Sequence, residues 1–390
     1  MVRAEEHVTV LTDATLVLPV GIVHGGWVAV ASGRITAIGG AHRSRPRDPD
    51  VLDLNGRWVL PGFVDLHVHG GGGYGYANGD PTEARTASSV HRLHGTTSAL
   101  ASLATAPLDE MVRAAGVLAD LADAGALVGI HAEGPFLSPA HAGDGEQDPA
   151  AMLQPDPNVL QQLMDACRGH LKVLTIAPEL PGALELIKRA VGLDVRVAVG
   201  HTGASYQRTL DAIEAGASLA THLFHAQPGL NHREPGAVGA LLEHPGVVVE
   251  LIADGVHLHD ALLAMVFRLC GAERIALVTD AIAPAAAGDG RYQVGSHQVE
   301  VRGGVALVEG TNAIAGSTLT QDSALRRAVD AGVPLLDAVT ALTGTPARAL
   351  GIADRVGALV AGHAADLLVL GSQLEIDGVM IAGRWQRAPH

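Results

Sequence analysis

Residues 60–70 read LPGFVDLHVHG, and this segment carries the strongest structural signal of the sequence. A short apolar, β-like run leads directly into His67 and His69, which are separated by one residue. Side chains alternate between the two faces of a strand, so both imidazoles point to the same side, as the binding of one metal ion by both requires. Two histidines that only lined a core would each need a buried hydrogen-bond partner. The segment therefore predicts a strand that ends in a metal-binding histidine pair.

Beyond this segment, apolar β-like runs alternate with helical patterns. We expect strands at residues 63–69, 96–102, 127–130, 173–177, 195–201, 219–222, 247–253 and 275–280. We expect helices at residues 81–93, 108–124, 184–191, 206–215 and 260–270. Eight buried strands that alternate with helices predict an α/β fold, a TIM-like (β/α)8 barrel. A doubly wound open sheet is the alternative, but no Gly-x-Gly-x-x-Gly follows the first strand, so we favour the barrel.

The two ends of the chain have a different texture. Residues 8–60 form short β-like runs separated by Gly and Asp turns, and similar runs return near the C-terminus. The two ends therefore predict a small β-sandwich domain that is assembled from both terminal segments. We expect residues 1–58 and 351–390 to form this domain and residues 59–350 to form the barrel. A Gly-rich segment, residues 287–310, follows the eighth strand.

The composition narrows the class of protein. A hydrophobic content of 48% and a charged content of 17% fit a folded α/β enzyme better than a disordered chain. The formal net charge of −15 argues against nucleic acid, and against an anionic membrane surface, as the partner. No segment reaches the roughly 18 uncharged apolar residues of a membrane span. The two cysteines provide no disulfide framework and the N-terminus has no apolar signal-peptide run, so we expect a cytoplasmic protein.

Histidine is unusually frequent, with 20 residues, and several histidines lie at the ends of the expected strands. Besides the pair on the first strand, the strand-end residues are Glu133, His201, His222 and Asp280, and His257 lies just past the seventh strand. The carboxyl ends of barrel strands converge on one mouth, where barrel enzymes perform their chemistry. A single histidine there would be weak evidence, but ligands and acids at the ends of five strands predict a metal-dependent active site.

Motifs along the chain support a family resemblance. Segment 60–70 and residues 357–367, GALVAGHAADL, resemble the amidohydrolase superfamily. Five further motifs are similar to the N-acetylglucosamine-6-phosphate deacetylase family, namely HAEGPFL at 131–137, GHT at 200–202, THLF at 221–224, ADGVH at 253–257 and AGSTLT at 315–320. The matches occur in the expected order over essentially the whole chain.

The resemblance implies a metal centre and a reaction. Glu133, His201 and His222 would bind a divalent metal ion. Some family members replace the first histidine pair and use one ion, whereas the presence of His67 and His69 allows a second ion that shares Glu133, so both one and two ions stay open. Carboxylate and imidazole ligands suit Zn²⁺, although Fe²⁺, Mn²⁺ and Co²⁺ accept the same set. The implied reaction is hydrolysis of the acetamido group of N-acetylglucosamine 6-phosphate, which gives glucosamine 6-phosphate and acetate.

The resemblance also implies residues for catalysis and for substrate binding. Asp280 would be the general base of the reaction. Arg233 and His257 would hold the phosphate of the amino sugar phosphate substrate. Family members often supply this arginine from the neighbouring subunit, so a homodimer is expected. The sugar site would be lined by residues of two loops, His225, Ala226, Ile314 and Ala315.

Two departures from the family pattern concern substrate recognition. Residues 142–145 read AGDG where family members commonly read KGAH, and residues 224–227 read FHAQ where they read FNAM. Neither departure touches the expected metal ligands or the base. The departures leave open a deacetylase for another N-acetyl amino sugar, such as N-acetylgalactosamine 6-phosphate or an unphosphorylated sugar.

Two further alternatives carry less weight. Hydantoinase- and dihydroorotase-like ring openers resemble the same superfamily but use a carboxylated lysine at the end of the fourth strand. In this chain Lys172 lies at the start of that strand, and no lysine lies at its end. A non-catalytic barrel usually lacks a ligand or the base, whereas all of them are present here. The sequence therefore favours a deacetylase.

Overall fold

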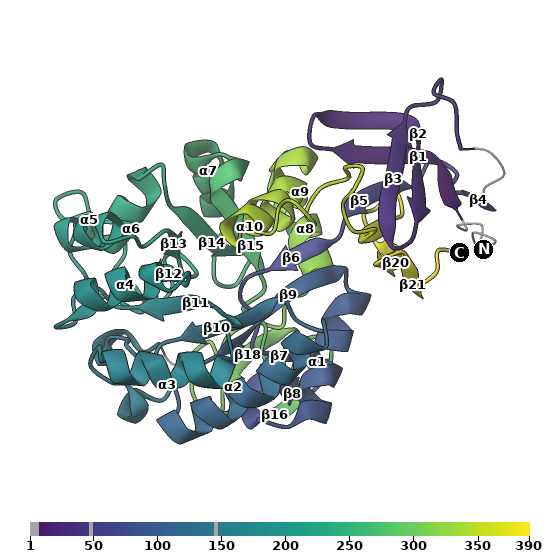
Figure 1. The fold of residues 1–390 in the computed structure, drawn as a ribbon. Helices are drawn as coiled ribbons and strands as arrows, with labels where there is room; N and C mark the ends of the chain where they lie inside the picture. The colour runs from purple at the N-terminus through teal and green to yellow at the C-terminus, as the bar shows by residue number, and fades with distance from the viewer. Residues whose placement is uncertain (1–7, 47–49, 144–146, 296) are drawn as a thin grey trace.

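The computed structural model describes residues 8–46, 50–143, 147–295 and 297–390. Its largest part is a barrel of parallel strands with helices on the outside (Figure 1). In the described residues the barrel strands are β6 (Phe63–Asp65), β9 (Thr96–Leu103), β10 (Gly129–Glu133), β11 (Leu171–Ile176), β12 (Arg196–Val199), β13 (Leu219–Ala220), β14 (Val248–Ile252) and β15 (Ile275–Val278). Each strand pairs with its neighbour in chain order from β6 to β15. The predicted (β/α)8 barrel is confirmed.

The barrel closes where its first strand meets its last. Val68, beyond β6, forms a parallel bridge with Ala281, beyond β15. The Asp280 N–H donates to the His67 carbonyl at 2.8 Å, and the His69 N–H donates to the Ala281 carbonyl at 2.8 Å. Closure thus brings the histidine pair of the first strand beside the aspartate at the end of the last strand.

Helices form the outer layer around the strands. They are α1 (Pro81–Leu93), α2 (Leu108–Asp123), α3 (Pro157–Cys167), α4 (Ala183–Gly192), α5 (Tyr206–Glu214), α6 (Gly236–Glu243), α7 (Asp260–Cys270), α8 (Gln321–Asp330), α9 (Leu335–Leu342) and α10 (Gly344–Ala349). Local sequence sets several starts. Asp80 and Asp156 cap α1 and α3 through their carboxylates, and a proline follows at the first helical position, where it needs no N–H partner.

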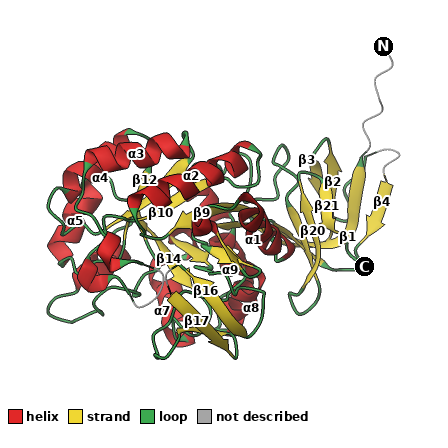
Figure 2. Cartoon of the chain, turned by 90° about the horizontal axis from the view of Figure 1, so that it is seen from below, coloured by secondary structure: helices red, strands yellow, loops and turns green. Residues whose placement is uncertain are grey.

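Both chain ends meet in a separate small sheet beside the barrel (Figure 2). Its described strands are β1 (Thr9–Leu18), β2 (Gly21–Ala31), β3 (Arg34–Gly39), β4 (Asp50–Asp53), β5 (Trp58–Pro61), β19 (Leu367–Leu370), β20 (Ile376–Ile381) and β21 (Arg384–Arg387). The C-terminal strand β19 pairs antiparallel with β5, which joins the two ends. The prediction of a small β domain built from both ends is confirmed, and its strands form one hydrogen-bonded sheet with its own apolar core.

The Gly-rich segment after β15 forms an antiparallel sheet that the sequence does not predict. Its strands are β16 (Gly290–Val294), β17 (His297–Arg302) and β18 (Val305–Val308). Gly303 and Gly304 have φ values of 57° and 78° and form the tight turn between β17 and β18, where a left-handed backbone favours glycine. Apolar residues of this insert pack on Ile282 and Ala283, which follow Asp280 in the segment after β15. The insert therefore lies at the mouth of the barrel.

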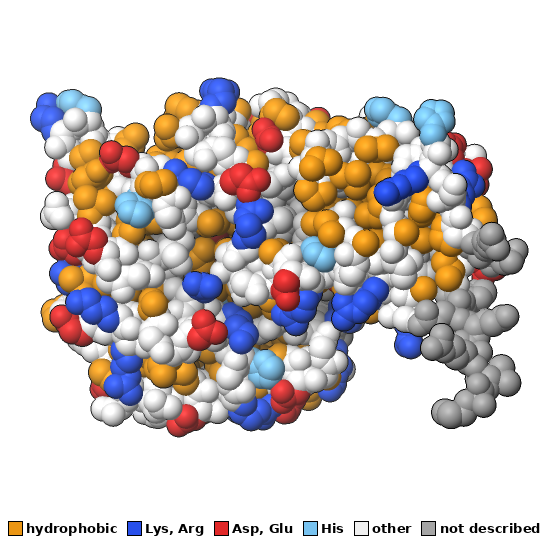
Figure 3. All heavy atoms as spheres, turned by 45° about the horizontal axis from the view of Figure 1, so that its top comes forward, with side chains coloured by type: hydrophobic (Ala, Val, Ile, Leu, Met, Phe, Trp, Pro, Cys, Tyr) orange, Lys and Arg blue, Asp and Glu red, His pale blue; other side chains and the backbone are white. Residues whose placement is uncertain are grey.

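Figure 3 shows one face of the molecule. Acidic and basic side chains are interspersed over the face in Figure 3, and apolar side chains gather toward the small sheet domain. In the described part of the chain, no helix has both the length and the apolar character that crossing a membrane requires.

Candidate active site

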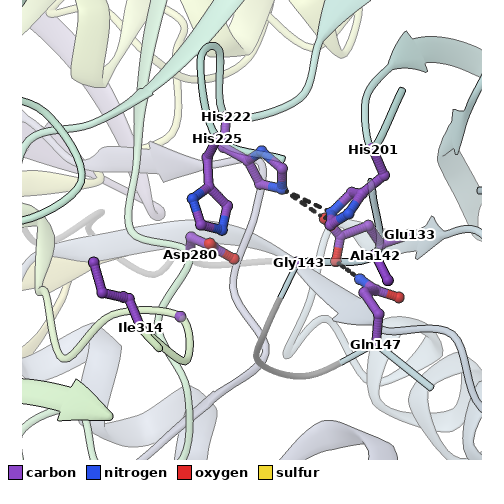
Figure 4. A pocket seen from close by; sticks show the side chains of 10 residues that line it. Glu133, Ala142, Gly143, Gln147, His201, His222, His225, Asp280 and Ile314 are labelled. Atoms are coloured by element: carbon purple, nitrogen blue, oxygen red, sulfur yellow. Dashed lines mark hydrogen bonds and ion pairs between the residues drawn. The ribbon is translucent and has the colours of Figure 1, made fainter. Parts of the chain in front are cut away.

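Among the predicted metal ligands and the predicted base, three residues have a strained backbone. His201 follows β12 with φ 48°, His222 follows β13 with φ 23°, and Asp280 follows β15 with φ 47°. Non-glycine residues in this left-handed region cost about 1 kcal/mol or more each, and such outliers cluster at functional sites. The chain turns sharply at each of these strand ends, and all three side chains line one pocket (Figure 4).

Glu133 lies at the centre of two groups of metal-competent side chains. In the first group, Glu133 Oε1 lies 3.0 Å from His201 Nε2 and 2.9 Å from His222 Nε2. In the second group, Glu133 Oε2 lies 3.3 Å from His69 Nε2, and Glu133 Oε1 lies 3.5 Å from His67 Nε2. All five side chains are buried. The structure thus brings together every predicted metal ligand around one shared carboxylate.

The donor arrangement fits divalent cations. The Nε2 atoms of His67 and His69 are 2.9 Å apart, and those of His201 and His222 are 3.1 Å apart. The opposite nitrogens of two rings have partners, since His67 Nδ1 lies 3.1 Å from Glu250 Oε2 and His201 Nδ1 lies 3.0 Å from a backbone carbonyl. A hydrogen on Nδ1 leaves the Nε2 lone pair free to bind a metal ion. Imidazole nitrogens with a carboxylate are the donors that transition-metal sites use.

Asp280 completes this cluster. Its Oδ1 lies 3.2 Å from His67 Nε2 and 3.4 Å from His69 Nε2. Burial by itself raises the pKa of Asp280, but the nearby His67 and His69 outweigh burial and hold that pKa below its usual range. Burial lowers the pKa of His67, whereas the Glu133 and Asp280 carboxylates outweigh burial and raise it. The Asp280 carboxylate is therefore ionised at neutral pH and can accept a proton.

His225 lines the pocket, and the ring of His257 contacts the ring of His225. His225 and His257 have ring centroids 5.0 Å apart, and Figure 4 shows His225 between His222 and Asp280. Burial, then His222 and His257, lower the pKa of His225 to about 3, so its imidazole is neutral. His257 Nδ1 lies 2.7 Å from Asp254 Oδ2, which outweighs burial and raises the pKa of His257. Within the described residues, His257 Nε2 is buried without a hydrogen-bond partner and is available to a ligand.

The other expected substrate residues differ in placement. Ile314 lines the pocket across from His225. Ala315 is fully buried behind it, and its N–H donates to the Ala306 carbonyl at 3.1 Å. Ala226 adjoins the pocket in a left-handed conformation, with φ 53°. Arg233 is exposed in the loop between β13 and α6, where its guanidinium contacts the neighbouring His232, and it does not line this pocket.

Gln147 is a pocket residue that sequence reasoning misses. It is buried, its Nε2 donates to Glu133 Oε2 at 2.5 Å, and its Oε1 accepts from the Thr105 N–H at 2.7 Å. It follows the departure at residues 142–145 closely, but of that departure Asp144 and Gly145 lie outside the described residues. The available signal is an amide side chain shortly after the HAEGPFL motif.

Two buried polar residues beneath the metal ligands are also missed as site residues. Glu250 interrupts the apolar strand β14, and its Oε2 lies near both His67 Nδ1 and the His222 N–H, at 3.1 and 3.3 Å. His131 lies two residues before Glu133 on β10, and its Nε2 lies 2.8 Å from Thr175 Oγ1. Burial, followed by His67, lowers the pKa of His131 well below its usual range, so its ring is a neutral hydrogen-bonding group.

Known proteins share this fold and sequence. A model of the amidohydrolase family matches residues 58–386. The chain is 33% identical to N-acetylgalactosamine-6-phosphate deacetylase from Escherichia coli O157:H7, over 92% of this chain and 95% of the relative. It is 32% identical to N-acetylglucosamine-6-phosphate deacetylase from Bacillus subtilis (strain 168), over 94% of both chains.

A solved structure extends the comparison. A mutant N-acetyl-D-glucosamine-6-phosphate deacetylase from Mycobacterium smegmatis, in complex with N-acetyl-D-glucosamine-6-phosphate, superposes with a TM-score of 0.93. It is 40% identical and covers 98% of this chain and 100% of its own. The chain therefore belongs to the amidohydrolase family and, within it, to the N-acetylglucosamine-6-phosphate deacetylase group.

Proposed function

We propose that this enzyme hydrolyses the acetamido group of N-acetylglucosamine 6-phosphate, giving glucosamine 6-phosphate and acetate in amino sugar metabolism. The observation that carries the proposal is the position of Asp280, whose Oδ1 lies within 3.4 Å of the imidazoles of His67 and His69. Glu133 contacts these two imidazoles and also those of His201 and His222. The relatives with this activity, and the substrate complex of the Mycobacterium smegmatis enzyme, support the choice of substrate.

The metal-binding groups have a defined part in this reaction. Glu133, His201 and His222 would hold one divalent ion, and His67 and His69 would hold a second ion through the same carboxylate. We propose Zn²⁺, because buried imidazole and carboxylate donors suit this ion. A bound divalent ion supplies a Lewis acid for the amide carbonyl and the attacking water.

The residues of the chain move the proton. Asp280 accepts a proton from the attacking water as the new C–O bond forms at the acetamido carbon. It then donates this proton to the sugar nitrogen as the C–N bond breaks, so one water is consumed and acetate and an amine are released. The hydrogen bond from the Asp280 N–H to the His67 carbonyl, at 2.8 Å, holds the base beside the ligands during both transfers.

Substrate binding uses the open side of the pocket. His257, fixed by Asp254, directs its buried Nε2 toward the substrate phosphate, and His225 contacts the sugar. We propose that Arg233 reaches the phosphate in the active site of a second subunit of a homodimer, because its own exposed loop does not bring it to the pocket. Both cysteines are free thiols, and we place the enzyme in the reducing cytoplasm.

One alternative substrate has specific support. His225 replaces the asparagine of the family pattern, and one relative at 33% identity acts on N-acetylgalactosamine 6-phosphate. Turnover of N-acetylglucosamine 6-phosphate, N-acetylgalactosamine 6-phosphate and unphosphorylated N-acetylglucosamine separates the possibilities. We expect kcat/KM to be highest for N-acetylglucosamine 6-phosphate. Equal values with and without the phosphate would contradict the role of His257 and Arg233, and a preference for the galactose epimer would establish the alternative.

A further inference from the structure

A cavity of about 420 Å³ lies at the end of the barrel where the strands begin, opposite the strand ends that carry the metal ligands. Lys172, near the start of β11, and Arg196, the first residue of β12, both line it. Residues 350–352, which follow α10, and Arg355 form its other wall. None of its lining residues lines the pocket that holds Asp280. The cavity is therefore a separate compartment of the molecule.

The local structure directs Lys172 into this cavity. Two consecutive residues of β10 pair with Leu171 and Val173 of β11, so Lys172 is the extra residue of a β-bulge. Such a bulge re-aims a side chain. The neighbouring Gly129 has no side chain, and a Cβ there would lie 2.4 Å from Lys172 Cγ. The glycine thus leaves the space in which the lysine side chain lies against β10.

Arg196 reaches the same cavity from the inner face of the barrel. It pairs with Val173 of β11, and Val173 packs with Ala198 in a cluster that also includes residues of β9 and β13. Side chains two positions apart on a strand share a face, so Arg196 and Ala198 both point inward. A Cβ on Gly351 would lie 3.9 Å from Arg196 Nη2, so the guanidinium extends to the opposite wall. Within the described residues, that guanidinium has neither a hydrogen bond nor an ion pair.

The charge of this cavity contrasts with that of the chain. Lys172, Arg196 and Arg355 all line it, although the formal net charge of the protein is −15. Lys172 Nζ donates to the Gly169 carbonyl at 3.0 Å, and Arg355 Nε lies 3.7 Å from the exposed Asp354. A recess lined by one sign of charge attracts counter-ions, and guanidinium and ammonium groups bind phosphate through charge-assisted hydrogen bonds. The strongly negative net charge disfavours a long polyanion, so the cavity suits a small phosphorylated molecule.

Asp194 narrows the class of ligand further. It is the one carboxylate among the described lining residues, and its side chain has no hydrogen bond or ion pair within the described part of the chain. A carboxylate repels phosphate but accepts hydrogen bonds from hydroxyl groups. About 15 Å³ in this measure holds one water-sized group, so the cavity has room for a whole sugar phosphate. A ligand with a phosphate at one end and hydroxyls at the other matches both kinds of side chain.

We propose that this cavity is a second binding site, separate from the active site, for a sugar phosphate. Lys172, Arg196 and Arg355 hold the phosphate, and Asp194 accepts hydrogen bonds from the sugar hydroxyls. The site binds its ligand without reaction, so the proposal goes beyond the proposed hydrolysis and does not depend on it. Strand β12 connects the two sites, because Arg196 begins it and the metal-ligand candidate His201 follows its other end.

The first test is titration calorimetry of the metal-loaded enzyme with glucosamine 6-phosphate. We expect two equivalents per wild-type chain, one at the active site and one in this cavity with a Kd of about 1 mM or lower. The Lys172→Gln/Arg196→Gln double variant should weaken one site by about tenfold or more, because charge-assisted contacts are lost, and should keep the wild-type kcat and KM. Wild-type stoichiometry and affinities in the double variant would overturn the proposal. A single equivalent that the double variant loses would support this site and contradict product binding at the active site instead.

The second test separates recognition of the sugar from attraction of any anion. Inorganic phosphate should bind the cavity about tenfold more weakly than glucosamine 6-phosphate, and Asp194→Ala should abolish this preference. The Lys188→Gln/Arg189→Gln variant removes the same charge from exposed positions of α4 and should bind both ligands as the wild type does. An equal loss of binding in this control would indicate a non-specific charge effect and would overturn the proposal. Equal wild-type affinities for the two ligands would overturn the assignment of a sugar.

Discussion

Each carboxylate oxygen of Glu133 faces imidazole nitrogens: Oε1 lies 2.9 Å from His222 Nε2, and Oε2 lies 3.3 Å from His69 Nε2. At the scale of residues, the ligands could be predicted because each sits at a strand end within a short motif. Gln147 and Glu250 could not. Gln147 contacts Glu133 because the loop after β10 folds back over the strand end, and Glu250 on β14 contacts His67 from across the barrel. Neither contact follows from spacing along the sequence.

The assignment of Asp280 as the base predicts a separation of metal binding from turnover. Asp280→Asn keeps the side-chain volume but removes the proton acceptor, so kcat should fall by about two orders of magnitude or more. Metal content, measured in parallel by elemental analysis, should stay at the wild-type value. Near-normal kcat in a metal-loaded Asp280→Asn enzyme would contradict the assignment.

Glu250 is expected to position ligands of both groups, since its Oε2 lies 3.1 Å from His67 Nδ1 and 3.3 Å from the His222 backbone nitrogen. Loss of such an outer partner typically lowers metal affinity 10- to 100-fold. Glu250→Leu should therefore lose its metal to a chelator concentration about 10- to 100-fold lower than the concentration that strips the wild-type enzyme. Glu250→Gln keeps an acceptor oxygen, so its metal retention should lie between that of the wild type and that of Glu250→Leu. Full metal retention by Glu250→Leu would show that the contact is dispensable.

At the scale of elements, the barrel strands follow their expected order because buried strands give continuous apolar runs. The expected helices correspond to α1, α2, α4, α5 and α7, whereas α3 and α6 fall outside the expected ranges. The insert β16–β18 is different. Its glycines interrupt the alternation that would reveal short strands, and its apolar residues become meaningful only when packed on Ile282 and Ala283. The insert β16–β18 therefore could not be predicted from the sequence pattern.

Gly200 tests the packing of β12 against its neighbours. A Cβ at this position would lie 2.6 Å from Thr221 Cβ and 3.0 Å from Thr175 Cγ2. Gly200→Ala should therefore lower the free energy of unfolding by about 1–3 kcal/mol, as overpacking does, and reduce metal content by displacing His201. Gly192→Ala, at the end of α4 with no atom near the added methyl, is the matched control and should be neutral or slightly stabilising. Denaturant unfolding of both variants checks the comparison, and equal stabilities would contradict it.

His91 on α1 links that helix to the turn after His69 and gives stability a pH dependence. Its Nε2 lies 2.8 Å from the Gly70 carbonyl oxygen, and burial lowers the pKa of His91 to about 4. Because the unfolded chain binds this proton near pH 6.5, stability is lost as pH falls from 6.5 toward 4, by up to about 3 kcal/mol.

Unfolding free energies between pH 4 and 7 check this contribution. His91→Gln should flatten the acid-side slope relative to wild type, because glutamine does not titrate. His42→Gln, at an exposed histidine of the small domain, should keep the wild-type slope. Parallel slopes for wild type and His91→Gln would show that His91 does not titrate between the two states.

At the scale of the whole molecule, two features combine. The barrel closes by hydrogen bonds between the residues after β6 and β15, and this closure places His67 and His69 next to Asp280. The small sheet joins both ends of the chain through the pairing of β19 with β5. The barrel could be predicted from strand count and strand-end chemistry. The position of Arg233 relative to a substrate could not be predicted, because Arg233 is exposed in the single chain and does not reach the pocket of that chain.

The most direct test of the central claim is product analysis with N-acetylglucosamine 6-phosphate and purified protein of known metal content. We expect free amine and acetate in a one-to-one ratio over many turnovers, and release of both at least about a hundredfold slower with Asp280→Asn. A folded, metal-loaded wild-type protein that releases neither amine nor acetate from this substrate would contradict the account.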